Sequence, residues 1–149
     1  MKRVVLIVLG LFVLGCLGVF AVAQIVPYGR AHQNPPVVQE PAWDSPHTRA
    51  LAQRACFDCH SNETVWPWYS NVAPISWQVQ RDVDEGREKL NFSEWGMGEQ
   101  EADEIYESVQ EGEMPMGIYL LTHPEARLNA EEKGLLLSGL QKMFGRGDD

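Results

Sequence analysis

The sequence predicts an all-α protein in which one apolar N-terminal helix precedes a single small helical domain. Residues 4–26 form a long apolar run, and the later part of the chain shows apolar residues at helical spacing together with capping residues. No stretch has the alternating pattern and turn residues of a β-hairpin. We therefore expect three parts: 1–26, a signal-anchor or transmembrane helix; 27–43, a proline-rich stalk; and 44–149, the helical domain.

The first part is long enough to cross a membrane. Residues 4–26 have the sequence VVLIVLGLFVLGCLGVFAVAQIV, in which Gln24 is the only strongly polar residue. At about 1.5 Å of rise per residue, this helix would cross a hydrocarbon core of roughly 30 Å. Lys2 and Arg3 precede it, and positive charge before a first span favours a cytoplasmic N-terminus. We expect a single-pass protein of the cytoplasmic membrane with its domain on the periplasmic, extracytoplasmic side.

Two other interpretations of this segment stay open. A signal peptide could be cleaved after Ala21-Val22-Ala23, although its apolar region is typically only about 7–15 residues long. A lipoprotein would use Cys16, and its mature chain would then begin with a further apolar stretch. All three interpretations place the domain outside the cytoplasm.

The domain is expected to open with two helices. Ser45 is placed to cap the first, with Pro46 at its first position and Leu51, Ala52 and Ala55 on one side. The second should begin near Pro74. Its expected buried side consists of Ile75, Val79, Val83 and Leu90, and its expected solvated face of Arg81, Asp82, Asp84, Glu85, Arg87 and Glu88.

Two more helices should follow. The first of these is expected from about Glu99 to Glu111, with Gly112 placed to end it. The last should start at Asn129, where Glu132 completes a capping box, and should close at Gly145. Their expected apolar positions are Ala102, Ile105 and Val109 in the former and Leu135, Leu136, Leu140 and Phe144 in the latter.

The domain is strongly acidic. Without Lys2 and Arg3, 10 basic residues face 21 acidic ones, a net charge of −11. Nucleic acid and anionic lipid both attract positive charge, so this balance argues against either as a ligand. It fits a solvated surface, or docking to a partner with a basic surface.

The stretch CFDCHSNETVWPWYS, residues 56–70, contains two cysteines and a histidine that are candidate functional residues. A redox dithiol of the thioredoxin type needs a βαβ context, and a zinc site usually needs a second Cys or His pair; neither is visible. The full C-x-x-C-H pattern is the signature of covalent haem attachment, in which two cysteines bond the porphyrin and the histidine becomes the proximal iron ligand. We expect Cys56, Cys59 and His60 to hold one haem c in this way.

The other axial position decides what such an iron does. Methionine gives an electron-transfer iron, and an open position permits ligand binding or peroxide chemistry. Met114 is our expected distal ligand because Pro115 stiffens the loop that would present its sulfur. His123, Met116 and an open site remain alternatives, and the further candidates are Met97, Met143, His32 and His47.

The aromatic residues are expected near the haem. The chain has Trp66, Trp68, Tyr69, Trp77 and Trp95, and we expect Trp66 or Trp77 to pack beside the porphyrin. Arg81 and Arg87 are most simply part of a solvated helix face, with a contact to a haem propionate as the alternative.

Several long phrases resemble a known family. The phrases CHSNETVWPWYSNVAPISW, RDVDEGREKLNFSEW, EGEMP and HPEARL are similar to those of the bacterial membrane-anchored haem-binding domain family of c-type cytochromes, and the likeness covers nearly the whole chain. The resemblance implies a monohaem domain held outside the membrane by one helix. Cys56, Cys59 and His60 correspond to its attachment motif, and Met114 falls in its Glu-Met-Pro phrase.

Together these observations predict a cytochrome c-like helical domain around one covalent haem. We expect a single-electron carrier of the cell envelope, with His60 and Met114 on the iron and redox donor and acceptor proteins as partners, and no enzymatic turnover. The alternatives are an open-site haem enzyme or sensor, such as a peroxidase-like or gas-binding domain, and a structural haem subunit of a membrane redox complex.

Overall fold

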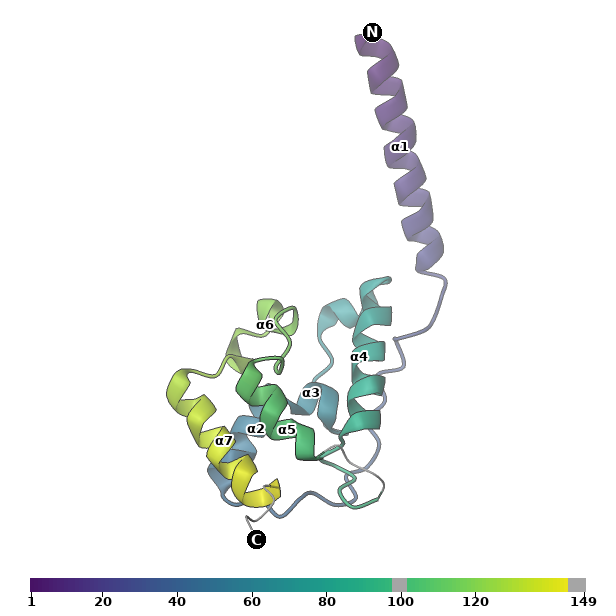
Figure 1. Cartoon of the computed structure of the whole chain (residues 1–149). Helices are drawn as coiled ribbons and strands as arrows, with labels where there is room; N and C mark the ends of the chain where they lie inside the picture. The colour runs from purple at the N-terminus through teal and green to yellow at the C-terminus, as the bar shows by residue number, and fades with distance from the viewer. Residues whose placement is uncertain (98–101, 145–149) are drawn as a thin grey trace. The chain divides into compact units, whose positions relative to one another are not determined.

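Every regular element in the described part of the chain is a helix. The computed structural model describes residues 1–97 and 102–144, and confirms the all-α class over these ranges. The only strand-like pairing there is an isolated parallel bridge between Gln39 and Glu94. The helices, shown in Figure 1, are α1 (Lys2–Ala23), α2 (Pro46–Ala55), α3 (Phe57–His60), η1 (Trp68–Asn71), α4 (Ile75–Lys89), α5 (Ala102–Glu111), α6 (Tyr119–Thr122), η2 (Pro124–Ala126) and α7 (Ala130–Phe144).

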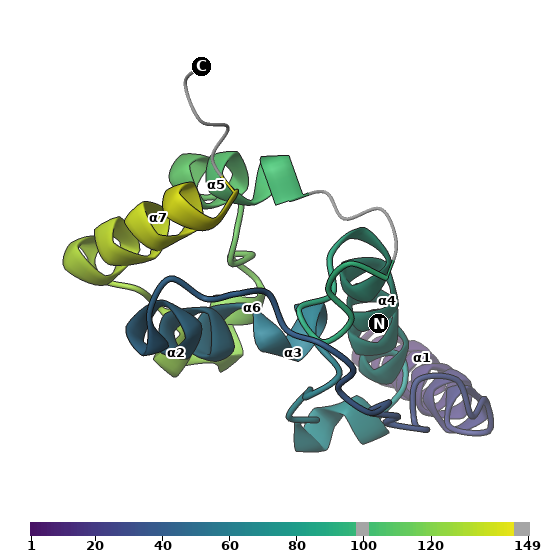
Figure 2. The same ribbon diagram turned by 90° about the horizontal axis from the view of Figure 1, so that it is seen from below.

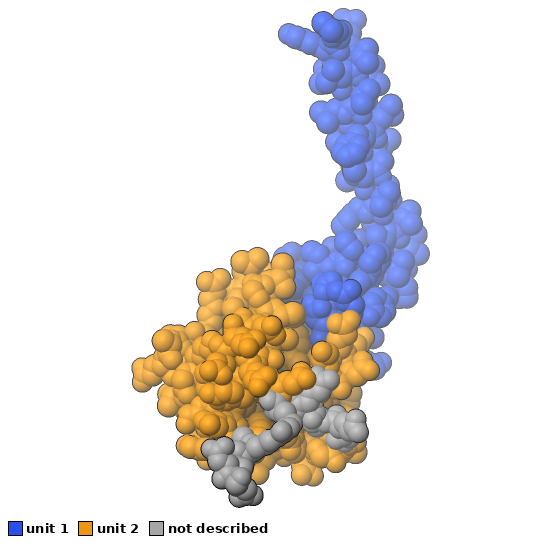
Figure 3. Space-filling model, viewed as in Figure 1, with its two compact units in different colours: residues 1–33, 66–82 blue, residues 34–65, 83–149 orange. Residues whose placement is uncertain are grey.

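The chain divides into two compact units, coloured separately in Figure 3. Unit 1 comprises residues 1–33 and 66–82, and therefore contains α1, η1 and the first half of α4. Unit 2 comprises residues 34–65 and 83–149 and contains the other helices together with the end of α4.

In unit 1, α1 is long and apolar enough to cross a membrane, and none of its most apolar window is buried against protein. The helix has no acidic residue in its first turn and no basic residue in its last. Its length and apolar surface match the predicted N-terminal segment.

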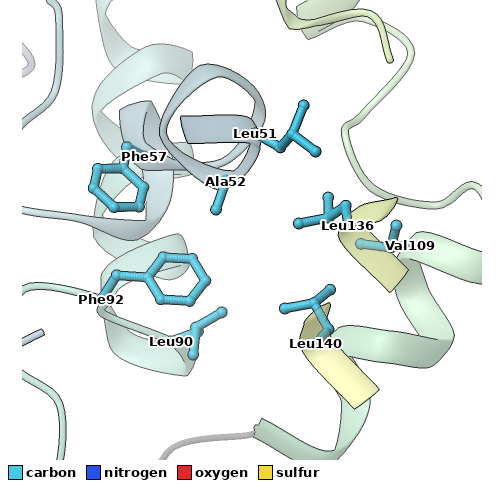
Figure 4. Packing of buried hydrophobic residues seen from close by; sticks show 8 residues of the cluster. All are labelled: Leu51, Ala52, Phe57, Leu90, Phe92, Val109, Leu136 and Leu140. Carbon is cyan, nitrogen blue, oxygen red and sulfur yellow. The ribbon is translucent and has the colours of Figure 1, made fainter. Parts of the chain in front are cut away.

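Unit 2 is built around one hydrophobic cluster, shown in Figure 4. Helices α2, α5 and α7 line one part of it, and α5 and α7 lie side by side (Figure 2). Aromatic rings extend it, since Phe92 stacks on Phe57 at 5.5 Å between centroids and lies 5.3 Å from Trp43. The buried members are Leu51, Ala52, Phe57, Leu90, Phe92, Val109, Leu136 and Leu140.

The predicted caps of α2 and α7 are confirmed. The Ser45 hydroxyl accepts the Thr48 amide at 3.1 Å. Asn129 and Glu132 form the reciprocal capping box, each backbone N–H donating to the other side chain at 2.9 Å. After α5, Gly112 adopts a φ of +80°, which favours glycine and ends the helix as expected.

The region expected as a stalk has two structural parts. Residues 27–33 belong to unit 1, and residues 34–43 belong to unit 2. In unit 2 the Val38 amide donates to the Ser93 carbonyl at 2.9 Å, and the Trp95 amide donates to the Gln39 carbonyl at 2.9 Å. These bonds attach the extended segment to the stretch that follows α4.

Two predicted core positions are wrong. Ile75, at the start of α4, is 48% exposed, whereas Val83 and Leu90, later in the chain, are buried. Leu135 is 46% exposed because Leu136, Gly139 and Leu140 form the inward face of α7. The predicted helix start at Glu99, the side chain of Ala102 and the predicted stop at Gly145 lie outside the described residues.

Candidate functional site

The cysteine motif forms a single tight helical turn. α2 ends at Ala55, Cys56 caps both α2 and α3, and α3 carries the rest of the motif. The amides of Cys59 and His60 both donate to the Cys56 carbonyl, at 3.2 and 2.9 Å. Neither cysteine is joined in a disulfide, and both are partly buried. This turn presents Cys56, Cys59 and His60 from one short stretch of backbone.

The thiol of Cys56 is unlike that of a redox dithiol. Burial raises its pKa to about 12, and the neighbouring Cys59 adds to the effect. A nucleophilic cysteine in a C-x-x-C motif instead has a lowered pKa, which makes it a thiolate near neutral pH. The surroundings of Cys56 therefore favour a buried sulfur over thiol exchange.

The ring of His60 is oriented by backbone carbonyls. Its Nδ1 lies 2.9 Å from the Gly86 oxygen and 3.2 Å from the Leu90 oxygen. Carbonyl oxygens only accept hydrogen bonds, so Nδ1 carries the proton and Nε2 keeps its lone pair. Burial lowers the pKa of His60, which favours the neutral imidazole. A neutral ring with Nδ1 held in this way is the form in which histidine binds a metal.

Gly86 allows α4 to approach the motif. A Cβ placed on this residue would lie 2.6 Å from the Cys59 carbonyl oxygen and 3.1 Å from the Cys59 Cβ. No side chain larger than hydrogen fits there without movement of the backbone. Sequence reasoning missed this residue, although a glycine in the middle of a predicted helix is a signal of close packing.

Asp58 connects the motif to its surroundings. Its Oδ1 accepts the Val65 amide at 2.9 Å, and its backbone oxygen accepts the Thr64 hydroxyl at 2.7 Å. Its Oδ2 accepts the hydroxyl of Tyr119, in α6, at 2.7 Å. Burial and the Asp58 carboxylate both raise the pKa of Tyr119, so the phenol stays protonated. Sequence analysis singled out neither residue.

Arg87 corrects another expectation, because it does not belong to a solvated face. Its Nε donates to the Ser61 carbonyl at 2.8 Å, and its terminal nitrogen donates to Thr64 at 2.9 Å and to Asn34 at 3.1 Å. Burial lowers its pKa. The side chain therefore supports the segment that follows His60. Arg81, by contrast, is exposed and donates to Gln78 within α4, as expected of a solvated face.

The structure brings Met114 and Cys56 to the same hydrophobic cluster. Both are partly buried and pack against its buried members. The Met114 amide donates to the Ser108 carbonyl at 3.1 Å, which attaches the loop to the end of α5. Met116 is also partly buried, whereas Met97 is 65% exposed.

The histidines considered as alternative ligands have other contacts. His123 stacks on Tyr119 at 4.0 Å between ring centroids and caps η2. His47 is exposed on α2, and His32 belongs to unit 1, where it stacks on Trp66 at 4.7 Å. Of the two tryptophans expected beside a porphyrin, both Trp66 and Trp77 belong to unit 1, whereas the cysteine motif belongs to unit 2.

The residues of the motif fit a haem. Two unlinked cysteines lie on one turn, the adjoining histidine has its Nε2 available, and apolar side chains pack beside them. These side chains, together with the match to a haem-binding family model, identify the chain as a haem protein. The chain belongs to the haem-binding domain family, whose model matches residues 18–142. Comparisons with curated proteins and with solved structures found no match.

Proposed function

We propose that this haem protein is a membrane-tethered monohaem c-type cytochrome that carries single electrons in the cell envelope, on the periplasmic side of the cytoplasmic membrane. The observation that supports this best is the orientation of His60. Its Nδ1–H is directed at the carbonyls of Gly86 and Leu90, so the lone pair of Nε2 remains available to bind a metal. It adjoins a turn that carries two cysteines not joined in a disulfide.

The proposed roles follow from the donor atoms. Cys56 and Cys59 would hold one haem c covalently, each thiol adding across a porphyrin vinyl group to give a thioether. His60 would bind the iron through Nε2, and Met114 would bind it through its sulfur. When bound, the haem supplies a ferric–ferrous couple that takes up and releases one electron.

The chain supplies the surroundings of that couple. Apolar residues of the cluster in unit 2 exclude water, and a thioether ligand raises the reduction potential relative to a second histidine. The carbonyls of Gly86 and Leu90 fix the ring of the proximal ligand, so its geometry need not change between the two oxidation states. In the proposed role, α1 crosses the bilayer, and the acidic surface docks on redox donors and acceptors with basic surfaces.

The distal ligand is tested by absorption spectroscopy of the oxidised protein. We expect the weak far-red charge-transfer band of a methionine-ligated ferric haem in the wild type, its loss in Met114→Ala, and its retention in the neighbouring variant Met116→Ala. A band that survives in Met114→Ala contradicts this assignment. Covalent attachment is tested separately by haem staining of the denatured chain, which should weaken in Cys56→Ala and in Cys59→Ala.

Ligand binding separates the carrier from an open-site haem enzyme or sensor. The reduced wild type should not bind carbon monoxide rapidly, because Met114 fills the position, whereas Met114→Ala should bind it. Rapid binding by the wild type, or peroxide turnover that disappears in His123→Ala, would favour the open-site alternative instead.

A further inference from the structure

Within unit 1, the segment around Ala73 is hydrogen-bonded to the end of α1. Gln24, the C-cap of α1, donates from Nε2 to the Ala73 carbonyl at 2.8 Å, and its Oε1 accepts the Ala73 amide at 3.1 Å. Arg30 reinforces the junction by donating to the Gln24 carbonyl at 2.9 Å and to its Oε1 at 3.1 Å. The one strongly polar side chain at the end of the apolar helix is thereby satisfied by backbone of the 66–77 segment.

A second set of contacts extends this junction. A Cβ on Gly29, which has a φ of +79°, would overlap the Ser76 carbonyl, so glycine permits a close backbone approach. His32 stacks on Trp66, and its Nε2 lies 2.9 Å from the Ser70 hydroxyl. Residues 24–32 therefore run along the 66–76 segment, which lies at the level where α1 ends.

The surface at this junction is apolar and aromatic. Trp68 is 80% exposed and Ile25 is 78% exposed. Ile75 and Tyr28 are each 48% exposed. Trp68 makes an edge contact with Tyr69, at 5.8 Å between ring centroids, and most of its surface still faces outward.

An apolar recess adjoins this surface. Its walls come from the stretch of α1 between Phe12 and Ala23, including Val19 and Phe20, and from Pro74 and Trp77. A bilayer that surrounds α1 would also reach this recess, because both share the same stretch of helix. Acyl chains match its lining.

We propose that Ile25, Tyr28, Trp68 and Ile75 form a lipid-docking surface that lies in the headgroup–acyl boundary of the membrane crossed by α1. This proposal rests on the membrane-spanning role of α1 in the proposed function. Tryptophan and tyrosine concentrate at this boundary because their rings are apolar and their N–H and O–H groups are polar. The surface is continuous with the span, which identifies lipid as its occupant.

The attraction is apolar and not electrostatic. After α1, the charged residues of unit 1 are Arg30, Arg81 and Asp82. Arg30 already bonds to Gln24. No polybasic cluster is present to recruit anionic lipid. Docking should therefore be independent of the anionic lipid fraction and of salt.

Fluorescence quenching in nanodiscs tests the proposal on the full-length holoprotein. An environment-sensitive thiol label is placed at Trp68→Cys or Ile75→Cys in a Cys16→Ser background, with Arg81→Cys, exposed and further along α4, as the matched control. Lipids that carry a quencher near the headgroup should reduce the emission at positions 68 and 75 at least about threefold more than at position 81.

The native Cys16 separates the two proposals. Labelled in the otherwise unchanged holoprotein, and tested with lipids that carry the quencher on the acyl chain because Cys16 lies near the middle of the span, it reports whether α1 lies in the bilayer. Any labelling of Cys56 or Cys59 reports incomplete haem attachment. Quenching at Cys16 with equal quenching at positions 68 and 81 overturns the docking surface alone. No quenching at Cys16 overturns the span and the docking surface with it. Shielding of position 68 from aqueous iodide without lipid quenching would assign the surface to a protein partner, and would also overturn the proposal.

Discussion

The hydroxyl of Tyr119 donates a hydrogen bond of 2.7 Å to the carboxylate of Asp58, one of the two residues that lie between the cysteines of the motif. Met114 precedes Tyr119 by one short loop, and both lie in unit 2. This bond connects the loop that presents the proposed distal ligand to the turn that carries the proposed attachment site.

Removing the Tyr119 hydroxyl should loosen the distal side. In Tyr119→Phe we expect a loss of about 1.5–3 kcal/mol in unfolding free energy, because a partly buried bond to a carboxylate disappears. The Met114 loop should then open more often, and carbon monoxide should bind the reduced protein faster than it binds the wild type. Denaturant unfolding and stopped-flow spectroscopy measure the two effects.

The control is Thr122→Val, which alters an exposed hydroxyl of the same helix. Equal rates of carbon monoxide binding in Tyr119→Phe and the wild type would contradict the prediction.

A methyl group at position 86 should disturb the motif. Gly86→Ala brings a Cβ to 2.6 Å from the Cys59 carbonyl oxygen, so α4 must shift. We expect a loss of about 1–3 kcal/mol in stability and a lower yield of covalent haem. Gly134→Ala in α7 is the matched control, since no atom lies within 4 Å of its Cβ, and it should instead add up to about 1 kcal/mol through helix propensity. Equal stability of the two variants would show that the close approach is unimportant.

The hydrogen bonds from Arg87 to Ser61, Thr64 and Asn34 should make it more important for stability than its position on a charged helix suggests. Arg87→Leu leaves the Ser61 carbonyl and the Thr64 hydroxyl without this donor, and we expect a loss of about 1–3 kcal/mol. Arg81→Leu, on the exposed side of the same helix, should change stability by less than about 0.5 kcal/mol. Urea unfolding measures the loss of stability in both variants. A similar loss in each would show that Arg87 behaves as part of the solvated face.

Acid should weaken the contact between residues 34–43 and α2. Arg49 donates to both carboxylate oxygens of Glu40, and these bonds lower the pKa of Glu40, with a further contribution from Trp43. A carboxyl whose pKa is lower in the folded state contributes stability that is fully present above its ordinary pKa of 4.5. That stability is lost as the pH falls through the lower, folded-state pKa.

The difference in unfolding free energy between wild type and Glu40→Gln should thus be larger at about pH 7 than at about pH 3. Glu107→Gln, on an exposed part of α5, is the control variant. A difference for Glu40→Gln that does not depend on pH would contradict the prediction.

The helices could be predicted because their signals are local. Ser45, Pro46, Asn129, Glu132 and Gly112 act within a few residues of their own positions, and each does in the structure what the sequence indicated. The errors concern contacts between distant segments. Leu135 satisfies the helical period, but which of the adjacent residues Leu135 and Leu136 faces inward depends on the neighbouring helices. Ile75 also satisfies the period, yet it lies at the start of α4 and is exposed.

The candidate site divides in the same way. The motif residues Cys56, Cys59 and His60 could be found because their spacing alone is diagnostic. The groups that hold these motif residues in place could not be found from the sequence. The carbonyls of Gly86 and Leu90 leave no side-chain signature, and the Asp58–Tyr119 bond joins residues 61 positions apart.

The orientation of His60 has a consequence for how this protein can evolve. Because the acceptors for its Nδ1–H are main-chain oxygens, the side chain at position 90 can change among apolar residues that fill the same place in the core, and the ring will keep its orientation. Position 86, by contrast, must remain glycine, because a Cβ there would overlap the backbone of Cys59. Selection on the proximal ligand would thus act mainly on backbone shape, and homologous chains could diverge widely around the motif while they preserve its chemistry.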